Sequence, residues 1–219
     1  MKWLDEIKEE IAVIKERDPA IHSDLEAFLY PSFQVMRYYR RAHRHYLKGH
    51  YFRARYISQK ARKKTGIEIH PGATIGKRLF IDHGAGVIIG ETCEIGDDVT
   101  LYQGVTLGGT GKDCGKRHPT LGNNVMVGSG AKVLGPFKVG DNSRIAAGAV
   151  VLKEIPPDCT AVGVPARIVR MAGEKVNYNK EVDQIHVSDP VAAELAGITA
   201  MLEELSKKLD KLTNTSEGK

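Results

Sequence analysis

Aliphatic residues recur every six positions through the middle of the chain. One series starts at Ile69, a second is shifted by two positions, and a third runs from Leu121 to Val151. The members are Ile69, Ile75, Ile81 and Val87, then Ile95, Leu101 and Leu107, then Leu121, Val127, Val133, Val139, Ile145 and Val151. A strand of an ordinary sheet alternates with period two and has no break every six residues. The pattern therefore predicts one strand and one turn per repeat, with three repeats in each triangular coil.

Small residues and glycines recur at fixed positions within these repeats. A small residue often follows the aliphatic one by four positions, as Ala73 follows Ile69, and Gly often follows it directly, as in Val139-Gly140. We expect the aliphatic side chain to point inward and the small residue to fill a tight corner. We expect Gly to adopt backbone conformations that other residues avoid.

Residues 1–66 have helical periodicity instead. Ser23 and Glu26 form a capping box for a helix, and a break is expected near Lys48-Gly49. Asp18-Pro19 ends a first helix, because Pro lacks the amide donor. The apolar stripe of that first helix is Trp3, Leu4, Ile7, Ile11 and Ile14.

Residues 171–219 carry a heptad pattern after the helix-starting Asp189-Pro190. The seam is Val191, Leu195, Ile198, Leu202, Leu205, Leu209 and Leu212. Such a helix either packs on its own subunit or forms a parallel coiled coil between subunits, which we favour. The predicted domains are helices at 1–66, the solenoid at 67–170 and the C-terminal helix at 171–219.

The 219 residues have an ordinary globular composition, with 42% hydrophobic and 27% charged residues. No apolar run reaches the roughly 20 residues that span a bilayer, and the N-terminus does not resemble a signal peptide. Three cysteines lack metal-ligand spacing. We expect a cytoplasmic protein with reduced thiols, no membrane association and no metal.

The net charge of +5 comes largely from residues 37–64. The basic residues there are Arg37, Arg40, Arg41, Arg44, Lys48, Arg53, Arg55, Lys60, Arg62, Lys63 and Lys64. A nucleic-acid surface is one interpretation. A solvated helical face near an anionic small molecule is the one we prefer, because no nucleic-acid motif accompanies the charge. We expect no nucleic-acid partner.

One interruption of the repeat stands out. Leu107 and Leu121 are fourteen residues apart instead of six, an excess of eight, and residues 108–120 between them read GGTGKDCGKRHPT. Loops that project from rigid scaffolds often carry function. GGTGK is not a nucleotide-binding loop, because Thr106 stands where that pattern needs Gly and Asp113 follows Lys112.

Six motifs in this order resemble bacterial serine O-acetyltransferases, members of the hexapeptide-repeat acyltransferase superfamily. They are TGIEIHPGA at 65–73, IDHG at 81–84, GET at 90–92, VTLGGTGK at 105–112, KRHP at 116–119 and GVPAR at 163–167. The resemblance covers roughly residues 18–170. It implies a mainly β fold, a left-handed parallel β-helix with a helical N-terminus.

The resemblance also implies an activity. The enzyme would transfer acetyl from acetyl-CoA, a co-substrate, to the hydroxyl of L-serine, giving O-acetyl-L-serine and CoA. This is the first step of cysteine biosynthesis from serine, and it needs no permanently bound cofactor.

Acetyl transfer requires a base, because the serine hydroxyl loses its proton as it attacks the thioester. Histidine suits that role, with a carboxylate on its other ring nitrogen to fix the tautomer. His83 and Glu68 fit as catalytic residues. They are fifteen residues apart, slightly less than one coil of eighteen residues, so we expect their side chains to come within contact distance. Many family members have aspartate where this chain has Glu68.

The amino-acid substrate is a zwitterion whose ends need opposite charges. The resemblance assigns Asp18 and Asp82 to the ammonium group and Arg117 and His118 to the carboxylate. Asp18 as a plain helix terminator and His118 as a structural loop residue remain alternatives.

For acetyl-CoA, the resemblance implies a glycine loop that closes over the pantetheine arm and further contacts along the coils. The implied residues are Gly109, Thr110, Gly111, Ser129, Gly130, Ala131, Ala147, Gly148, Lys153 and Arg167.

The spacing of His83 and His118 bears on assembly. They are 35 residues apart, or about 27 without the eight-residue insertion, which is one and a half coils. They should therefore lie on different faces of one chain, so a substrate touching both would sit between subunits. We expect a homotrimer ahead of a dimer of trimers, because the helical region is shorter than in the hexameric members.

Two regulatory properties accompany the resemblance. L-cysteine inhibits many members by occupying the serine site, and many bind O-acetylserine sulfhydrylase through a C-terminal isoleucine. This chain ends Glu217-Gly218-Lys219, so we do not expect the sulfhydrylase complex.

Three other functions are alternatives. A hexapeptide acetyltransferase for a sugar or xenobiotic would lack the Asp18, Asp82 and Arg117 set. A zinc hydratase would need His70, His83 and His118 to converge, but His70 reads as a structural residue of a different corner. A non-catalytic scaffold held by the C-terminal seam would not need the DHG and RHP motifs.

Overall fold

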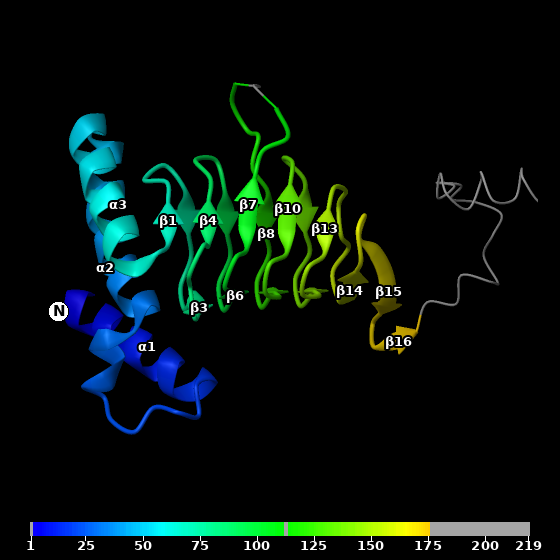
Figure 1. Cartoon of the computed structure of the whole chain (residues 1–219), viewed down its shortest axis with the longest axis horizontal. Helices are drawn as coiled ribbons and strands as arrows, with labels where there is room; N and C mark the ends of the chain where they lie inside the picture. The colour runs from blue at the N-terminus through cyan, green and yellow to red at the C-terminus, as the bar shows by residue number, and fades with distance from the viewer. Residues whose placement is uncertain (1, 112–113, 176–219) are drawn as a thin grey trace, which may run out of the picture. The chain divides into compact units, whose positions relative to one another are not determined.

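The computed structural model describes residues 2–111 and 114–175. The predicted C-terminal helix and its coiled coil lie outside these residues. Three parallel sheets form the faces of a solenoid (Figure 1). This is the β-helix of hexapeptide repeats that the six-residue period and the resemblance predicted.

Each sheet takes one strand from each coil. Sheet A comprises β1 (Glu68–Ile69), β4 (Ile88–Ile89), β7 (Thr106–Gly108), β10 (Lys132–Leu134) and β13 (Val150–Val151). Sheet B comprises β2 (Thr74–Ile75), β5 (Glu94–Ile95), β8 (Thr120–Leu121) and β11 (Lys138–Val139). Sheet C comprises β3 (Phe80–Asp82), β6 (Thr100–Tyr102), β9 (Met126–Val127), β12 (Arg144–Ile145) and β14 (Cys159–Val162), extended antiparallel by β15 (Arg167–Met171) and β16 (Glu174–Lys175).

The register reveals two insertions. In sheet A, Ile69 pairs with Ile89, Ile89 with Leu107, and Leu107 with Val133. The coils are therefore 20, 18 and 26 residues long (89−69, 107−89 and 133−107). The eight extra residues are the predicted loop. Two more lie between β3 and β4, which explains the two-position shift between the first two aliphatic series.

Val87 was placed in the wrong position by the sequence pattern. Ile89, not Val87, is the inward strand residue that continues from Ile69. Val87 is buried at the corner before β4. The sequence pattern missed the strand residue by two positions, because it counted six residues across the two-residue insertion. The other members of the three series are buried, apart from Ile75, which is partly buried and packs on the same core.

The glycines that follow the aliphatic residues are needed for a different reason from the one expected. Gly96 and Gly140 do not have the positive φ that would demand glycine. A Cβ at Gly140 would lie 2.3 Å from the backbone nitrogen of Pro157, and one at Gly96 would lie 2.8 Å from the carbonyl carbon of Gly122. These glycines therefore allow successive coils to stack closely.

Four helical segments cover the first coil (Figure 1). They are α1 (Lys2–Arg17), the 3₁₀ helix η1 (Glu26–Leu29), α2 (Pro31–Leu47) and α3 (Tyr51–Thr65). The contact expected of the capping box forms, since Ser23 Oγ accepts the Glu26 amide at 3.4 Å. It caps no α-helix, because Glu26 opens the short η1, whose N-cap position is Leu25 and has no side-chain cap bond. The next α-helix starts only at Pro31.

Polar contacts fasten the helices to the coils. The Tyr39 hydroxyl donates to the Ala73 carbonyl at 2.6 Å, and the Ser58 hydroxyl donates to the Ile69 carbonyl at 2.7 Å. Gly66, with φ of 73°, ends α3 and leads into β1. The division into domains at 66 and at 170 stays a prediction.

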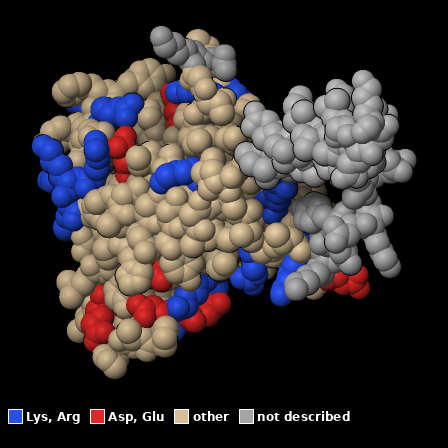
Figure 2. All heavy atoms as spheres, turned by 45° about the vertical axis from the view of Figure 1, so that its right-hand side comes forward, with Lys and Arg blue, Asp and Glu red and all other residues tan. Residues whose placement is uncertain are grey.

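The basic residues concentrate on α2 and α3. Figure 2 shows a group of Lys and Arg side chains at the helical end of the molecule. Several of these cations have partners within the chain, as Arg62 has in Glu68 at 3.3 Å. Among the described residues, no helix is long and apolar enough to cross a membrane.

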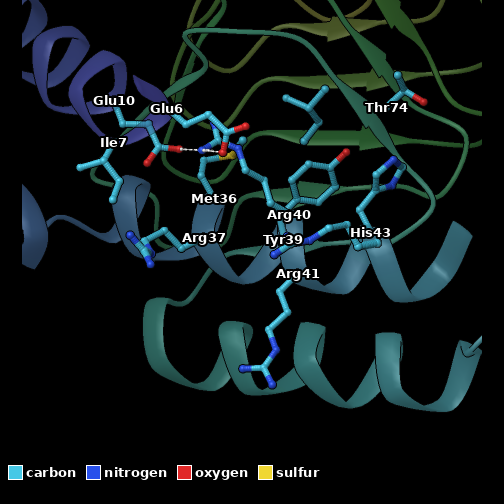
Figure 3. Close-up of a pocket in the computed structure, with 12 residues that line it drawn as sticks. Glu6, Ile7, Glu10, Met36, Arg37, Tyr39, Arg40, Arg41, His43 and Thr74 are labelled. Carbon is cyan, nitrogen blue, oxygen red and sulfur yellow. Dashed lines mark hydrogen bonds and ion pairs between the residues drawn. The ribbon is translucent and has the colours of Figure 1, made fainter. Parts of the chain in front are cut away.

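A cavity of about 530 Å³ lies between α1, α2 and β2 (Figure 3). Arg40 lies 2.7 Å from the Glu10 carboxylate and 3.5 Å from Glu6. Figure 3 shows Arg37 and Arg41 directed away from this pair, so the arginines do not converge on one point. Burial raises the pKa of Glu10 to about 7 and outweighs the attraction of Arg40.

Replacing Glu10 by Gln is expected to flatten the pH dependence of folding stability. The pKa of Glu10 is about 7 in the folded state and ordinarily 4.5, so the folded state binds the proton more tightly. The stability that Glu10 contributes is full below its ordinary pKa and is lost as the pH rises through the folded-state pKa. The loss is about 3 kcal/mol.

Urea unfolding at about pH 5 and about pH 8 measures this effect. The free-energy difference between wild type and Glu10→Gln should change with pH, whereas Glu9→Gln, next in the chain, should follow the wild type. A difference that is the same at both pH values contradicts the assignment.

Candidate active site

His83 stands at the corner that contains the two-residue insertion. Its φ is 59° and that of Gly84 is 69°, a left-handed pair that is uncommon for a histidine. A Cβ at Gly84 would lie 2.6 Å from Ile67 Cδ1, so glycine is required there. The corner directs the His83 side chain outward, where it is 73% exposed and its Nε2 lies 3.8 Å from Asp82 Oδ1.

Asp18 comes to the same place from the end of α1. Its Oδ2 accepts a hydrogen bond from the Tyr30 hydroxyl at 2.6 Å, and its Oδ1 accepts one from the Ala20 amide at 2.8 Å. These bonds, and then the charge of His83 nearby, lower the pKa of Asp18. Asp18, Asp82 and His83 thus form one polar group. Tyr30 was not found from the sequence, where only its place before Pro31 distinguishes it.

Glu68 has another partner in this chain. Its Oε2 lies 3.3 Å from Arg62 Nε, and among the described residues no hydrogen bond or ion pair joins it to His83. Asp82 is the carboxylate that lies beside His83. The orienting role of Glu68 stays a prediction.

The Gly90-Glu91-Thr92 motif holds the end of the insertion loop. Glu91 Oε2 accepts a hydrogen bond from Arg117 at 2.5 Å. The Thr92 hydroxyl accepts the amides of Arg117 and His118 at 3.0 and 3.1 Å. The His118 ring lies on Gly90, where a Cβ would approach its Nε2 to 2.1 Å. Glu91 therefore contacts Arg117, Gly90 contacts His118, and Thr92 contacts both.

The hydrogen bonds of His118 define its protonation. The Thr92 amide donates to Nδ1 at 3.2 Å, so Nδ1 carries no proton and the hydrogen of the neutral ring is on Nε2. Burial, and then the charge of Arg117, lower the pKa of His118. His118 is therefore built as a neutral hydrogen-bond donor.

The same cluster reaches α2 and the neighbouring corner. The Tyr46 hydroxyl donates to Glu91 at 2.9 Å, and the bond from Arg117, followed by that from Tyr46, lowers the pKa of Glu91. His70 Nδ1 accepts the Gly72 amide at 3.0 Å. Burial and then Arg55 lower the pKa of His70 to about 4. These contacts match the structural role expected of His70.

Two edges of the solenoid carry these groups. We call the turns from sheet C to sheet A the His83 edge, and those from sheet A to sheet B the His118 edge. His83 with Asp82 and Asp18 occupies the first, and His118 with Arg117 and His70 the second. One chain does not bring the two histidines together. Within residues 2–111 and 114–175, no three His, Cys, Asp or Glu side chains form a metal-binding group.

The residues implied for acetyl-CoA divide in the same way. Gly109, Thr110 and Gly111 belong to the loop of the His118 edge, and Lys153 lies on that edge too. The others lie on the His83 edge or on β15, namely Ser129, Gly130, Ala131, Ala147, Gly148 and Arg167. Ala131 is fully buried within this chain, so it exposes no surface to a ligand there.

Glycines run along the His83 edge as a column. Gly86, Gly104, Gly130 and Gly148 have φ values of 74°, 70°, 71° and 70°. The Gly130 amide donates to the Gln103 carbonyl and the Gly148 amide donates to the Ser129 carbonyl, both at 2.8 Å. A Cβ at Gly130 or Gly148 would meet nothing within 4 Å, so the edge is open and free of side chains at these positions.

A solenoid of six-residue repeats with polar groups gathered at its edges defines the class of hexapeptide transferases. The family model described as bacterial transferase hexapeptide (six repeats) matches residues 118–153. A serine acetyltransferase of Bacillus subtilis is 49% identical over 205 residues, which cover 93% of this chain and 94% of that protein. The chain belongs to the serine acetyltransferase family and is an acyltransferase.

Solved structures agree with this assignment. Serine acetyltransferase from Brucella abortus in complex with coenzyme A has a TM-score of 0.75 and 40% identity, covering 80% of this chain and 69% of that one. The enzyme of Neisseria gonorrhoeae in complex with serine has a TM-score of 0.73 and 37% identity, covering 77% and 69%.

Gly90→Ala should displace His118 and lower activity. The added methyl group would overlap the imidazole, and the φ of Gly90 allows any residue, so the effect should fall on the ring. We expect a loss in kcat/KM of about tenfold or more, with little change in melting temperature. Serine-dependent release of CoA from acetyl-CoA measures the loss.

The control is the same change in a His118→Ala background. With the imidazole absent, Gly90→Ala should cost little further activity. If the two losses multiply instead, Gly90 does not act through His118.

Proposed function

We propose that this enzyme transfers acetyl from acetyl-CoA to the hydroxyl of L-serine, giving O-acetyl-L-serine and CoA, with His83 as general base. The observation that carries the proposal is the group of two carboxylates, Asp18 and Asp82, beside an exposed histidine. Such a group suits a molecule that has an ammonium group close to a hydroxyl.

The reaction follows from this arrangement. The ammonium group of serine binds Asp18 and Asp82, which brings its hydroxyl to His83. The imidazole takes the hydroxyl proton as the oxygen attacks the thioester carbonyl. The carbon–sulfur bond of the tetrahedral intermediate then breaks, and the imidazolium returns the proton to the departing CoA sulfur. Glu68 is proposed to orient the imidazole.

Acetyl-CoA is proposed to lie along the glycine column of the His83 edge. Glycines allow a ligand to approach the backbone closely. An extended pantetheine arm along Gly104, Gly130 and Gly148 would have its thioester toward His83. We propose no permanently bound cofactor, because the chemistry needs only a base and a positioned thioester.

The catalytic unit is proposed to lie between two chains of a homotrimer. Arg117 and His118, on the other edge, would bind the carboxylate of a serine whose ammonium group and hydroxyl lie at the His83 edge of the neighbouring chain. In this proposal the His83 edge and the His118 edge each carry half of one site. Such an arrangement favours a cyclic assembly, in which the His83 edge of one chain faces the His118 edge of the next.

Acetyl-CoA with different acceptors tests the reaction. CoA release should depend on L-serine and fall strongly with threonine, homoserine or no acceptor. Release without preference for serine would overturn the proposal and favour another acceptor class. L-cysteine, which has sulfur in place of the serine oxygen, is proposed to compete for the same site. Its inhibition should weaken as the serine concentration rises.

Mixed oligomers test the shared site. His83→Ala and His118→Ala chains are each expected to be nearly inactive. Random mixing of equal amounts should restore about a quarter of wild-type activity, because a site needs an intact His83 on one chain and an intact His118 on the next.

A matched mixture of His83→Ala with the double variant His83→Ala/His118→Ala should remain inactive. Mixed trimers of the two single variants that also remain inactive would exclude a site shared between chains.

A further inference from the structure

Tyr30 links the helical region to the polar group around His83. Its hydroxyl donates to Asp18 Oδ2 at 2.6 Å, a length expected of a bond to a charged acceptor. The Asp18 bond, followed by burial, raises the pKa of Tyr30 to about 12. The phenol therefore stays protonated and can act only as a donor to this carboxylate.

The ring of Tyr30 is held in place by packing. It lies against a cluster that joins α1, η1, α2 and β3, comprising Val13, Ile14, Ala27, Phe33 and Phe80. The backbone of Tyr30 is extended, with φ of −62° and ψ of 131°, as expected before Pro31. The position of the hydroxyl is thus set before any substrate binds.

Asp18 is constrained on both sides. Arg17, the residue before it, donates to Thr100 Oγ1 at 2.6 Å and ties the end of α1 to β6. The Ala20 amide holds Oδ1, and Tyr30 holds Oδ2. With one donor fixed on each oxygen, the carboxylate cannot rotate freely, and its remaining lone pairs are left for another donor.

From these contacts we infer that Tyr30 is a positioning residue, which orients the Asp18 carboxylate to receive the ammonium group of the amino-acid substrate. The inference rests on the proposed function. Tyr30 acts through Asp18 and does not itself need to touch the substrate. Its removal should therefore weaken the binding of the amino acid and leave the binding of acetyl-CoA unchanged.

Tyr30→Phe tests this role, because it keeps the ring and removes only the hydroxyl. The KM for serine should rise by about tenfold, the effect of one hydrogen bond to a charged group. The KM for acetyl-CoA should stay within about twofold. Tyr56→Phe is the matched control, since Tyr56 is 64% exposed and its hydroxyl makes no side-chain hydrogen bond with the described residues.

The titration of Asp18 provides a readout without substrate. Carbon-13 NMR should show a higher pKa for Asp18 in Tyr30→Phe than in the wild type and no change in Tyr56→Phe. The charged groups near this pair are His83 and Asp82 from the β3 corner, Glu26 from η1 and Arg17 from α1. All of them are retained in both variants, so a change in pKa reports the lost hydroxyl.

A double variant shows whether Tyr30 acts through Asp18. In an Asp18→Asn background, Tyr30→Phe should raise the KM for serine little further. An unchanged KM for serine in Tyr30→Phe, equal increases for both substrates, or an unshifted Asp18 titration would each overturn the inference. Wild-type enzyme that releases no CoA with serine would overturn the proposed function instead, because the Asp18 titration is judged without substrate.

Discussion

The stacking of successive coils in one register is the constraint on which the rest of this structure depends. Each coil places an aliphatic side chain directly over its counterpart, as Ile69, Ile89, Leu107 and Val133 do along sheet A. Parallel hydrogen bonds and buried side chains both require this register. A coil that slipped by one residue would turn its apolar side chains outward. The strands therefore keep the same register from coil to coil, and insertions occur at the corners.

Both insertions fall at corners, and both carry the polar groups of the site. Two extra residues at the His83 corner let the chain enter the left-handed conformation that projects the imidazole. Eight extra residues form the loop that returns at Arg117 and His118. Neither insertion disturbs the stack, because the strands on each side resume their register. The stacked strands thus form a rigid scaffold, and the corners carry the polar side chains of the site.

The helices contribute more than a cover for the first coil. Arg17 and Tyr30 hold Asp18 beside the His83 corner, while Tyr46 reaches Glu91 at the other edge. The Asp18 carboxylate, directly after α1, and the Tyr46 hydroxyl, from α2, thereby join groups that the solenoid presents on two different edges. Changes in the helical region can therefore alter either half of the site without touching a coil.

The sequence by itself determined the solenoid, its loop and the break between helices and coils, because a six-residue period leaves few other ways to bury the aliphatic residues. It also marked His83, Asp82, Arg117 and His118 as candidates, through motifs whose order is specific. The six-residue count was wrong at Val87, because it did not detect the two-residue insertion before that position. The expectation of an unusual backbone conformation was also wrong for the glycines that follow the aliphatic residues, such as Gly96 and Gly140, which allow close stacking instead. Only the tertiary structure decided that Tyr30 bonds to Asp18, that Glu68 pairs with Arg62, and that Gly90, Glu91 and Thr92 hold the loop. These are contacts between side chains from different elements, and their geometry depends on packing that no local pattern records.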